Sequence, residues 1–310
     1  MFLLPNGVIH RIEAICRNFI WYGGIEYTKT PLVSWEKICK PKEEGGLGLK
    51  DDILWNRAAV GKLVWWVTSK SDHLWVKWVN HTYIKNNHWH NYSPPTSSSW
   101  YWRKICQVKE VFREAYQQNR WITNAGKEYT ISKGYEYIRV KCQKVDWHRM
   151  TWNKWTIPKH SFIAWIYKHK NMNTNDKLHN LGISTENTCC LCAQNVETLE
   201  HLFFDCGYSR KVIDLVSHWI RVPLPRHAIL QWSLRRRGVQ IKVDLTFAVI
   251  NAFIYHVWRQ RNLCKYGFTL TCPRKIALTV ETDLKIRLTG FFNSAQERDK
   301  VWIRDLLGTA

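Results

Sequence analysis

The sequence predicts a mainly α-helical fold with a few short β-strands, and three observations lead to this prediction. Apolar residues recur at helical spacing along most of the 310-residue chain. Residues 121–131 look like short strands around a turn at 124–127. Gly and Pro residues and polar runs separate these apolar segments, and the sequence has no internal repeat of fixed period. We therefore expect a helical N-terminal region, a small α+β domain and a helical C-terminal region.

The N-terminal third predicts three helices. Residues 5–22 carry an apolar helical face that Gly23 and Gly24 interrupt. The motif at 45–48, GGLG, does not match a phosphate-binding loop and predicts a turn. Asp51 and Asp52 occupy the N-cap position of a second expected helix, over residues 53–67. A third, Trp-rich helix is expected over residues 73–84.

A polar stretch with Pro94 and Pro95 separates these helices from the rest of the chain. Beyond it, further helices are expected, one of them capped by Ser132; they cover 100–116, 132–140, 160–170, 196–204, 210–220, 243–266 and 273–288. The expected organisation is a helical region over 1–85, a linker over 86–99, a cysteine-rich domain over 100–222 and a helical region over 223–310.

The composition indicates a folded protein with a polyanionic partner. There are 46 Lys and Arg against 25 Asp and Glu, which gives a net charge of +21. Hydrophobic residues make up 45% and aromatic residues 14% of the chain, with 19 Trp. Disordered basic tails lack such an aromatic share, so that class is excluded.

Neither secretion nor membrane insertion is expected. The apolar run at the N-terminus is broken by Pro5 and has no basic residues before it. The most apolar stretch, 246–258, is too short for a membrane span and contains Asn251 and His256. We expect a chain of the nucleus or cytoplasm, where clustered cysteines bind metal more often than they form disulfides.

A cysteine and histidine cluster is the strongest local motif. Cys189, Cys192, His201 and Cys206 have the spacing C-x2-C-x8-H-x4-C, which is typical of tetrahedral Zn²⁺ sites. Cys190 is too close to Cys192 to share one ion with it, so it is left as a spare thiol. Four protein ligands fill the tetrahedron, which predicts one structural zinc ion rather than a catalytic one. His201 is expected on the helix over 196–204, which ends near Cys206 with Gly207 as its terminator.

The charge around this motif is uneven. Residues 178–209 contain no Lys or Arg, whereas Glu186, Glu197, Glu200 and Asp205 are acidic. The zinc loop should therefore be anionic and should position neighbouring basic elements rather than touch phosphate itself. The candidate nucleic-acid contacts are Lys154, Lys159, Lys168, Lys170, Arg210, Lys211, Arg235, Arg236, Arg237, Arg259 and Arg261.

Other candidate sites are weaker. Most Trp residues are expected in helix packing rather than in base stacking. His81, His88 and His90 lack the Cys or acidic partners of a second metal site. No pair of carboxylates follows an apolar strand, so no catalytic residues are assigned.

Several of these motifs together resemble a known family. Residues 5–23 and 33–48 resemble the segment after the polymerase palm in plant LINE-type, non-LTR retrotransposon reverse transcriptases. Residues 155–162, 178–183 and the cysteine and histidine set, including 200–206, are similar to the reverse-transcriptase zinc-binding domain of those elements. Residues 255–262 are similar to the helix that follows it.

The resemblance implies a thumb-like or connector-like N-terminal region and a zinc-stabilised domain, without the endonuclease or the palm that holds the catalytic aspartates. We therefore expect a non-catalytic, zinc-stabilised fragment of a retrotransposon polyprotein that binds nucleic acid, RNA or an RNA/DNA hybrid. Two alternatives remain open: an accessory thumb or connector that acts with a palm supplied in trans, and a protein-interaction scaffold.

Overall fold

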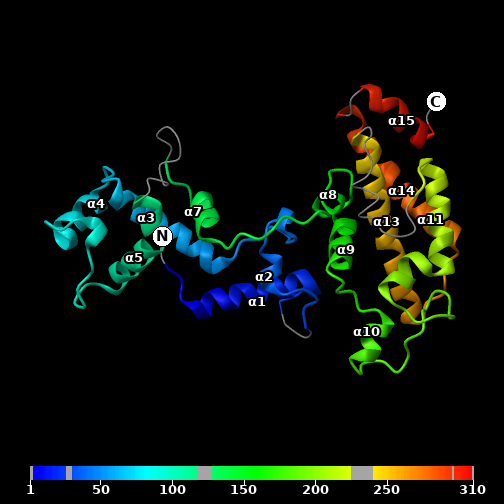
Figure 1. Ribbon diagram of the computed structural model, residues 1–310, viewed down its shortest axis with the longest axis horizontal. Coiled ribbons are helices and arrows are strands. Elements are labelled where there is room, and N and C mark those ends of the chain that lie inside the picture. The colour runs from blue at the N-terminus through cyan, green and yellow to red at the C-terminus, as the bar shows by residue number, and fades with distance from the viewer. Residues whose placement is uncertain (1–2, 26–29, 118–127, 225–239, 295–296, 309–310) are drawn as a thin grey trace. The chain divides into compact units, whose positions relative to one another are not determined.

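The computed structural model describes the chain except for residues 1–2, 26–29, 118–127, 225–239, 295–296 and 309–310 (Figure 1). The chain divides into two compact units, residues 1–41 with 46–143 and residues 42–45 with 144–310. The described residues are mainly α-helical, which confirms the predicted fold class. They contain one isolated antiparallel bridge, Thr188 to Val196, and no longer strand. Most of the expected strand region, 121–131, lies outside the described residues.

Unit 1 consists of helices and short helical turns. They are α1 (Asn6–Tyr22), α2 (Trp35–Ile38), α3 (Asp52–Thr68), α4 (Leu74–Val79), η2 (Asn80–Ile84), η3 (Trp89–Asn91), α5 (Trp100–Val111), α6 (Arg113–Gln117) and α7 (Ile131–Ile138). The Asp51 side chain accepts the N–H of Leu54 and begins α3, as the sequence predicts. Gly23, with φ 69°, ends α1 in the left-handed conformation that glycine adopts without strain.

The core of unit 1 forms where α3 packs against α5 and α7. Val60, Val64, Ile105 and Phe112 are among its buried side chains. The cap of α7 differs from the prediction: the N-cap is Thr130, two residues before Ser132, and its hydroxyl accepts the N–H of Lys133.

Residues 86–99, expected to be a linker, contribute side chains to this core. Trp89 and Tyr92 are buried. The ammonium of Lys109 on α5, 1% exposed, donates to the carbonyl oxygens of Trp89 at 3.3 Å and Tyr92 at 2.6 Å. This segment is therefore fixed to α5 by a buried lysine and two aromatic rings. The predicted domain boundaries stay a prediction.

Unit 2 contains η1 (Lys42–Glu44), α8 (His148–Thr151), α9 (Pro158–Lys168), α10 (Asn175–Asn180), η4 (His201–Asp205), α11 (Gly207–Ile220), α13 (Gln240–Lys265), α14 (Pro273–Phe291), η5 (Phe292–Ser294) and α15 (Glu297–Leu307). The sequence predicted a helical region over 223–310 but did not single out α15 as a separate helix. The turn predicted at 45–48 is present: Gly45 has φ 89°, and its carbonyl oxygen accepts the indole N–H of Trp165 at 2.8 Å.

Helix α13 is the centre of unit 2. It packs against α8, α9, α11 and α14 (Figure 1). Ala248, Ala252, Phe253 and Val257 on this helix are fully buried. A helix surrounded by others is apolar on most of its faces, which explains the long apolar run at 246–258 without a membrane. None of the described helices has the length and apolar character needed to cross a bilayer.

Candidate metal centre

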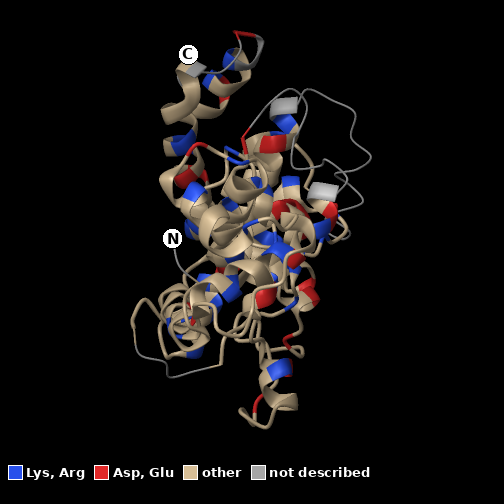
Figure 2. Cartoon of the chain, turned by 90° about the vertical axis from the view of Figure 1, so that its left-hand side faces the viewer, with Lys and Arg blue, Asp and Glu red and all other residues tan. Residues whose placement is uncertain are grey.

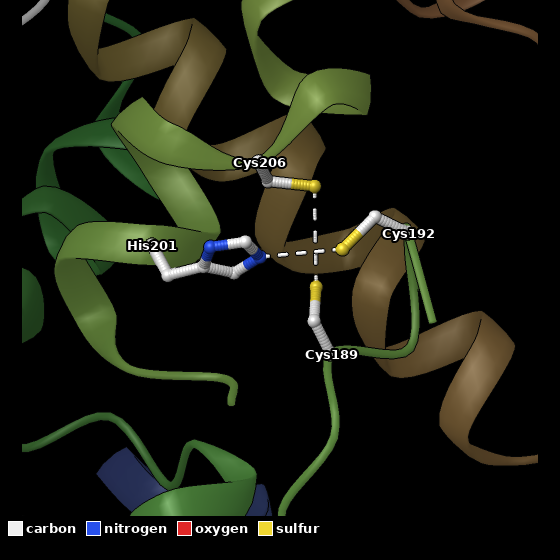
Figure 3. Close-up of side chains that lie close together, drawn as sticks. All are labelled: Cys189, Cys192, His201 and Cys206. Carbon is white, nitrogen blue, oxygen red and sulfur yellow. Dashed lines mark hydrogen bonds between the residues drawn. The ribbon is translucent and has the colours of Figure 1, made fainter. Parts of the chain in front are cut away.

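A tight loop between Thr188 and Val196 presents the first two cysteines. The antiparallel bridge between these two residues closes the base of the loop. The N–H of Ala193 donates to the carbonyl oxygen of Cys189 at 2.8 Å, and Ala193 has φ 53° at the turn. The chain reverses within four residues, so Cys189 and Cys192 project to the same side of the loop (Figure 3).

His201 and Cys206 come from the two ends of η4. The Thr198 hydroxyl accepts the N–H of His201 at 3.0 Å and fixes the start of this turn. The turn ends before Cys206, as predicted, but Gly207 does not terminate it. Gly207 is instead the first residue of α11, and Cys206 is the N-cap of that helix. The two helical elements meet at Cys206, and its thiol lies beside that of Cys189.

The four predicted side chains, here called the zinc group, point toward one centre (Figure 3). Their ligand atoms all lie within 4.8 Å of one another. The Sγ atoms of Cys189 and Cys206 are 4.0 Å apart, and Cys192 Sγ is 3.3 Å from His201 Nε2. In a zinc tetrahedron with ordinary bond lengths, S···S and S···N separations are about 3.8 Å and about 3.6 Å. The donor set and its spacing therefore fit one Zn²⁺ ion.

A hydrogen bond between two of these thiols shifts their pKa values in opposite directions. The bond to Cys206, together with burial, raises the pKa of Cys189, while the backbone N–H groups of Leu191 and Cys192 lower that pKa in part. The same bond between the two thiols lowers the pKa of Cys206 to about 5, helped by backbone N–H groups of Tyr208 and Ser209. A bound metal ion would take the place of the proton between these two sulfurs, because thiolate is the form that binds metal.

Cys190 stands outside the zinc group. Its Sγ accepts the side-chain amide of Asn175 at 3.3 Å. It is a separate thiol, in agreement with its treatment as a spare residue.

Glu197 and Arg261 form a buried ion pair beside the metal loop. Glu197 is 0% exposed and Arg261 is 2% exposed. The shortest distance between their charged atoms is 2.6 Å, from an Arg261 guanidinium nitrogen to Glu197 Oε1. Glu197 also accepts the backbone N–H of Asn175 at 2.9 Å. Arg261 thus connects α13 with the base of the zinc loop.

This pair corrects two expectations from the sequence. Glu197 was counted among the acidic residues that make the zinc loop anionic, but its charge is buried and paired with Arg261. Arg261 was a candidate phosphate contact, but its guanidinium lies inside unit 2. One signal was available: Arg261 follows the buried Val257 by four residues and so lies on the same buried face of α13. Glu186 and Glu200 are exposed.

The other candidate contacts occupy different environments. Lys154, Lys159, Lys170, Lys211 and Arg259 are exposed. The exposed Arg210 pairs with Asp205 at 3.1 Å and donates to the Phe204 carbonyl oxygen. Lys168 is half-buried, and burial lowers its pKa to about 8. Arg235, Arg236 and Arg237 lie outside the described residues. Figure 2 shows Lys and Arg spread over many helices.

Comparison with known proteins agrees with this geometry. Residues 129–212 match the family of zinc-binding domains in reverse transcriptase. All four side chains of the zinc group lie within the matched residues. The zinc cofactor predicted from the sequence is thereby confirmed.

Two relatives from Arabidopsis thaliana extend the comparison. One, named "Putative ribonuclease H protein", is 35% identical over 108 residues, which are 34% of this chain and 17% of that protein. The other, an uncharacterized mitochondrial protein, is 26% identical over 111 residues, which are 36% of this chain and 72% of that protein. The match with the first relative thus covers less than a fifth of its length. No solved structure matches significantly. Together the matches support a retroelement reverse-transcriptase region.

Proposed function

We propose that this chain is a non-catalytic, zinc-stabilised nucleic-acid-binding fragment of a plant LINE-type retrotransposon polyprotein. Its ligand is RNA or an RNA/DNA hybrid, and it acts in the nucleus or cytoplasm. The observation that carries the proposal is a zinc group with four protein ligands, flanked by exposed basic side chains, in a chain of net charge +21. Such a charge favours a polyanion, and zinc-binding domains of reverse transcriptases belong to proteins that handle RNA.

The metal is structural in this proposal. When zinc is bound, Cys189, Cys192, His201 and Cys206 fill its four positions, and no position is left for water or substrate. The zinc contributes folding energy, on the order of 10 kcal/mol in small zinc-binding peptides. It fixes the loop at 188–196 against η4 and the start of α11.

Phosphate contact is assigned to the exposed basic residues rather than to the zinc group. Three thiolates against one Zn²⁺ would leave the group with a charge of −1, and the exposed Glu186 and Glu200 belong to the same segment of the chain. Lys154, Lys170, Lys211 and Arg259 are exposed, with no carboxylate partner among the described ion pairs. Cations of this kind release condensed counterions when they bind phosphate, so the affinity falls as salt rises.

Filter binding of labelled RNA by the full chain, across a range of salt concentrations, tests the proposal. We expect retention at low salt and a linear decrease of log K with log salt. Changing three exposed lysines of unit 2 to Gln should reduce the slope by about 2, at roughly 0.7 per phosphate contact on a single strand; the lysines are Lys154, Lys170 and Lys211.

The matched control removes the same charge from unit 1, through Lys70→Gln, Lys85→Gln and Lys141→Gln, and should leave the slope nearly unchanged. No retention of RNA at low salt by the zinc-loaded, folded chain would refute the proposal. Equal effects of the two triple variants would refute the assignment of the contact surface. RNA/DNA hybrid and single-stranded DNA in parallel arms identify the preferred ligand.

A further inference from the structure

A second group of potential metal ligands lies in unit 2, apart from the zinc group. His160 on α9, His256 on α13 and Asp283 on α14 come together where these three helices pack. The Asp283 Oδ2 atom lies 3.2 Å from His160 Nε2 and 3.0 Å from His256 Nε2. The ligand atoms of the three residues are all within 4.8 Å of one another.

The two imidazoles are buried inside unit 2. His160 is 0% exposed and His256 is 3% exposed. A buried imidazole nitrogen that faces such a cluster can offer its lone pair to a metal ion.

The environment of the His160 ring indicates a bound ligand. Neither of its ring nitrogens makes a hydrogen bond within the described part of the chain, although the ring is fully buried. Its Nε2 is near Asp283, but the geometry does not satisfy a hydrogen bond, whereas His256 Nε2 does bond to Asp283 at 3.0 Å. Buried polar nitrogens nearly always have a well-formed hydrogen bond. A buried imidazole that lies 3.2 Å from a carboxylate without one is suited to share a metal ion with that carboxylate.

We propose that His160, His256 and Asp283 form a second binding site, for a divalent first-row metal ion such as Zn²⁺. Around a tetrahedral ion with ordinary bond lengths, N···O separations are about 3.3 Å, close to the 3.0 and 3.2 Å in the cluster. Two nitrogens and one carboxylate oxygen suit Zn²⁺ and its neighbours in the first row. Three protein ligands leave one position for water or an added ligand, unlike the closed zinc group.

Lys159 is the residue that competes with the ion. Its ammonium lies 3.8 Å from Asp283 Oδ2, and its side chain is 54% exposed. A bound cation would repel this ammonium, which can move into solvent. Removal of its charge by Lys159→Gln should therefore strengthen metal binding at the second site, whereas a purely structural cluster would not respond in this way.

The test is metal stoichiometry of the full chain, stripped with chelator and reloaded with Zn²⁺ or Co²⁺. We expect two ions per wild-type chain and one ion in Asp283→Asn and in His256→Gln. The remaining ion should keep the sulfur-to-cobalt charge-transfer absorption, which arises only from the zinc group and also reports that unit 2 is folded. Lys159→Gln should bind the second ion at least severalfold more tightly.

The converse variant is Cys192→Ser, which removes a ligand from the zinc group and should lower the sulfur absorption without acting on His256 or Asp283. A wild-type chain that binds a single ion with full sulfur absorption would overturn the second site. Two ions that persist in both Asp283→Asn and His256→Gln would also overturn it. Neither result bears on RNA binding, so failure of this proposal is distinguishable from failure of the proposed function.

Discussion

At the scale of single residues, Arg261 determines how the zinc loop is held. Its guanidinium donates to Glu197 and, at 2.8 Å, to the side-chain oxygen of Asn175. Asn175 in turn donates to the carbonyl oxygen of Thr188, at the base of the loop, at 2.7 Å. Removal of either member of a buried ion pair leaves an uncompensated charge, whereas removal of both does not.

We expect Arg261→Met to destabilise unit 2 by roughly 3–5 kcal/mol, because the Glu197 carboxylate is left buried and unpaired. Glu197→Gln should also be destabilising, and the double variant should recover much of the loss. Urea unfolding of the four proteins, as a double-mutant cycle with zinc present, measures the coupling. Strictly additive effects would mean that the two side chains are not coupled.

Lys168 illustrates how burial acts on a basic residue. Burial lowers its pKa to about 8 in the folded chain, against an ordinary value of 10.5. Between these pH values the unfolded chain holds a proton that the folded chain has released, so stability rises with pH through this window. Below pH 8 the Lys168 ammonium is charged in the folded chain as well, so the full cost of burying that charge reduces the stability.

Lys168→Met should therefore stabilise the chain at pH 7, on the order of 1–3 kcal/mol, and less at pH 10. Lys170→Met, a change of the exposed lysine two residues away, is the control and should show no such pH dependence. Thermal unfolding of both variants and wild type at the two pH values gives the comparison. An effect of Lys168→Met that is equal at both pH values would contradict the assigned cause.

At the scale of elements, the contact of α3 with α7 depends on glycine. A Cβ atom on Gly134 would lie 1.8 Å from the Tyr129 hydroxyl oxygen, so one of the two would have to move. That hydroxyl donates to the carbonyl oxygen of Ala58 on α3 at 2.6 Å, and Tyr129 is buried. The tyrosine is thus held by α3 on one side and by α7 on the other.

Gly134→Ala should destabilise unit 1 by about 1–3 kcal/mol through overpacking. Gly7→Ala on α1 is the matched control, since nothing lies within 4 Å of its added Cβ and alanine favours a helix. Denaturant unfolding should separate the two variants clearly. A Gly134→Ala protein as stable as wild type would show that Tyr129 does not hold this position.

The helices illustrate what the sequence can and cannot predict at this scale. The apolar periodicity of 5–22 and the Asp51 cap predicted α1 and α3, because both signals are local. The position of Gly207 was misjudged: glycine commonly ends helices, but here α11 begins at that residue. Helix α15, with its many charged residues, has only a short apolar face, formed by Ile303 and Leu306.

At the scale of the whole molecule, the sequence predicted that Cys189, Cys192, His201 and Cys206 come together, but it did not predict what surrounds them. Two cysteines three residues apart, a histidine and a third cysteine carry a spacing that itself specifies tetrahedral geometry. The pairing of Glu197 with Arg261 joins residues 64 positions apart, and the cluster of His160, His256 and Asp283 joins three helices. Such contacts depend on tertiary packing, which a single sequence does not reveal.

The net charge of +21 also needed the structure for its interpretation. The charge indicates a polyanionic partner, but the exposure of each Lys and Arg decides which of them can contact it. Arg261 is removed from the surface, Arg210 is paired with Asp205, and Lys170 and Lys211 remain exposed. The proposed contact surface is therefore narrower than the sequence suggested.

The most direct test of the zinc group is the sulfur-to-cobalt absorption of the Co²⁺-loaded chain, measured for Cys192→Ser and Cys190→Ser. These cysteines are two residues apart, but only Cys192 belongs to the zinc group. We predict that Cys192→Ser loses much of the absorption and unfolds at lower denaturant, whereas Cys190→Ser matches wild type in both respects. Loss of the absorption in Cys190→Ser with its retention in Cys192→Ser would contradict the zinc site described above.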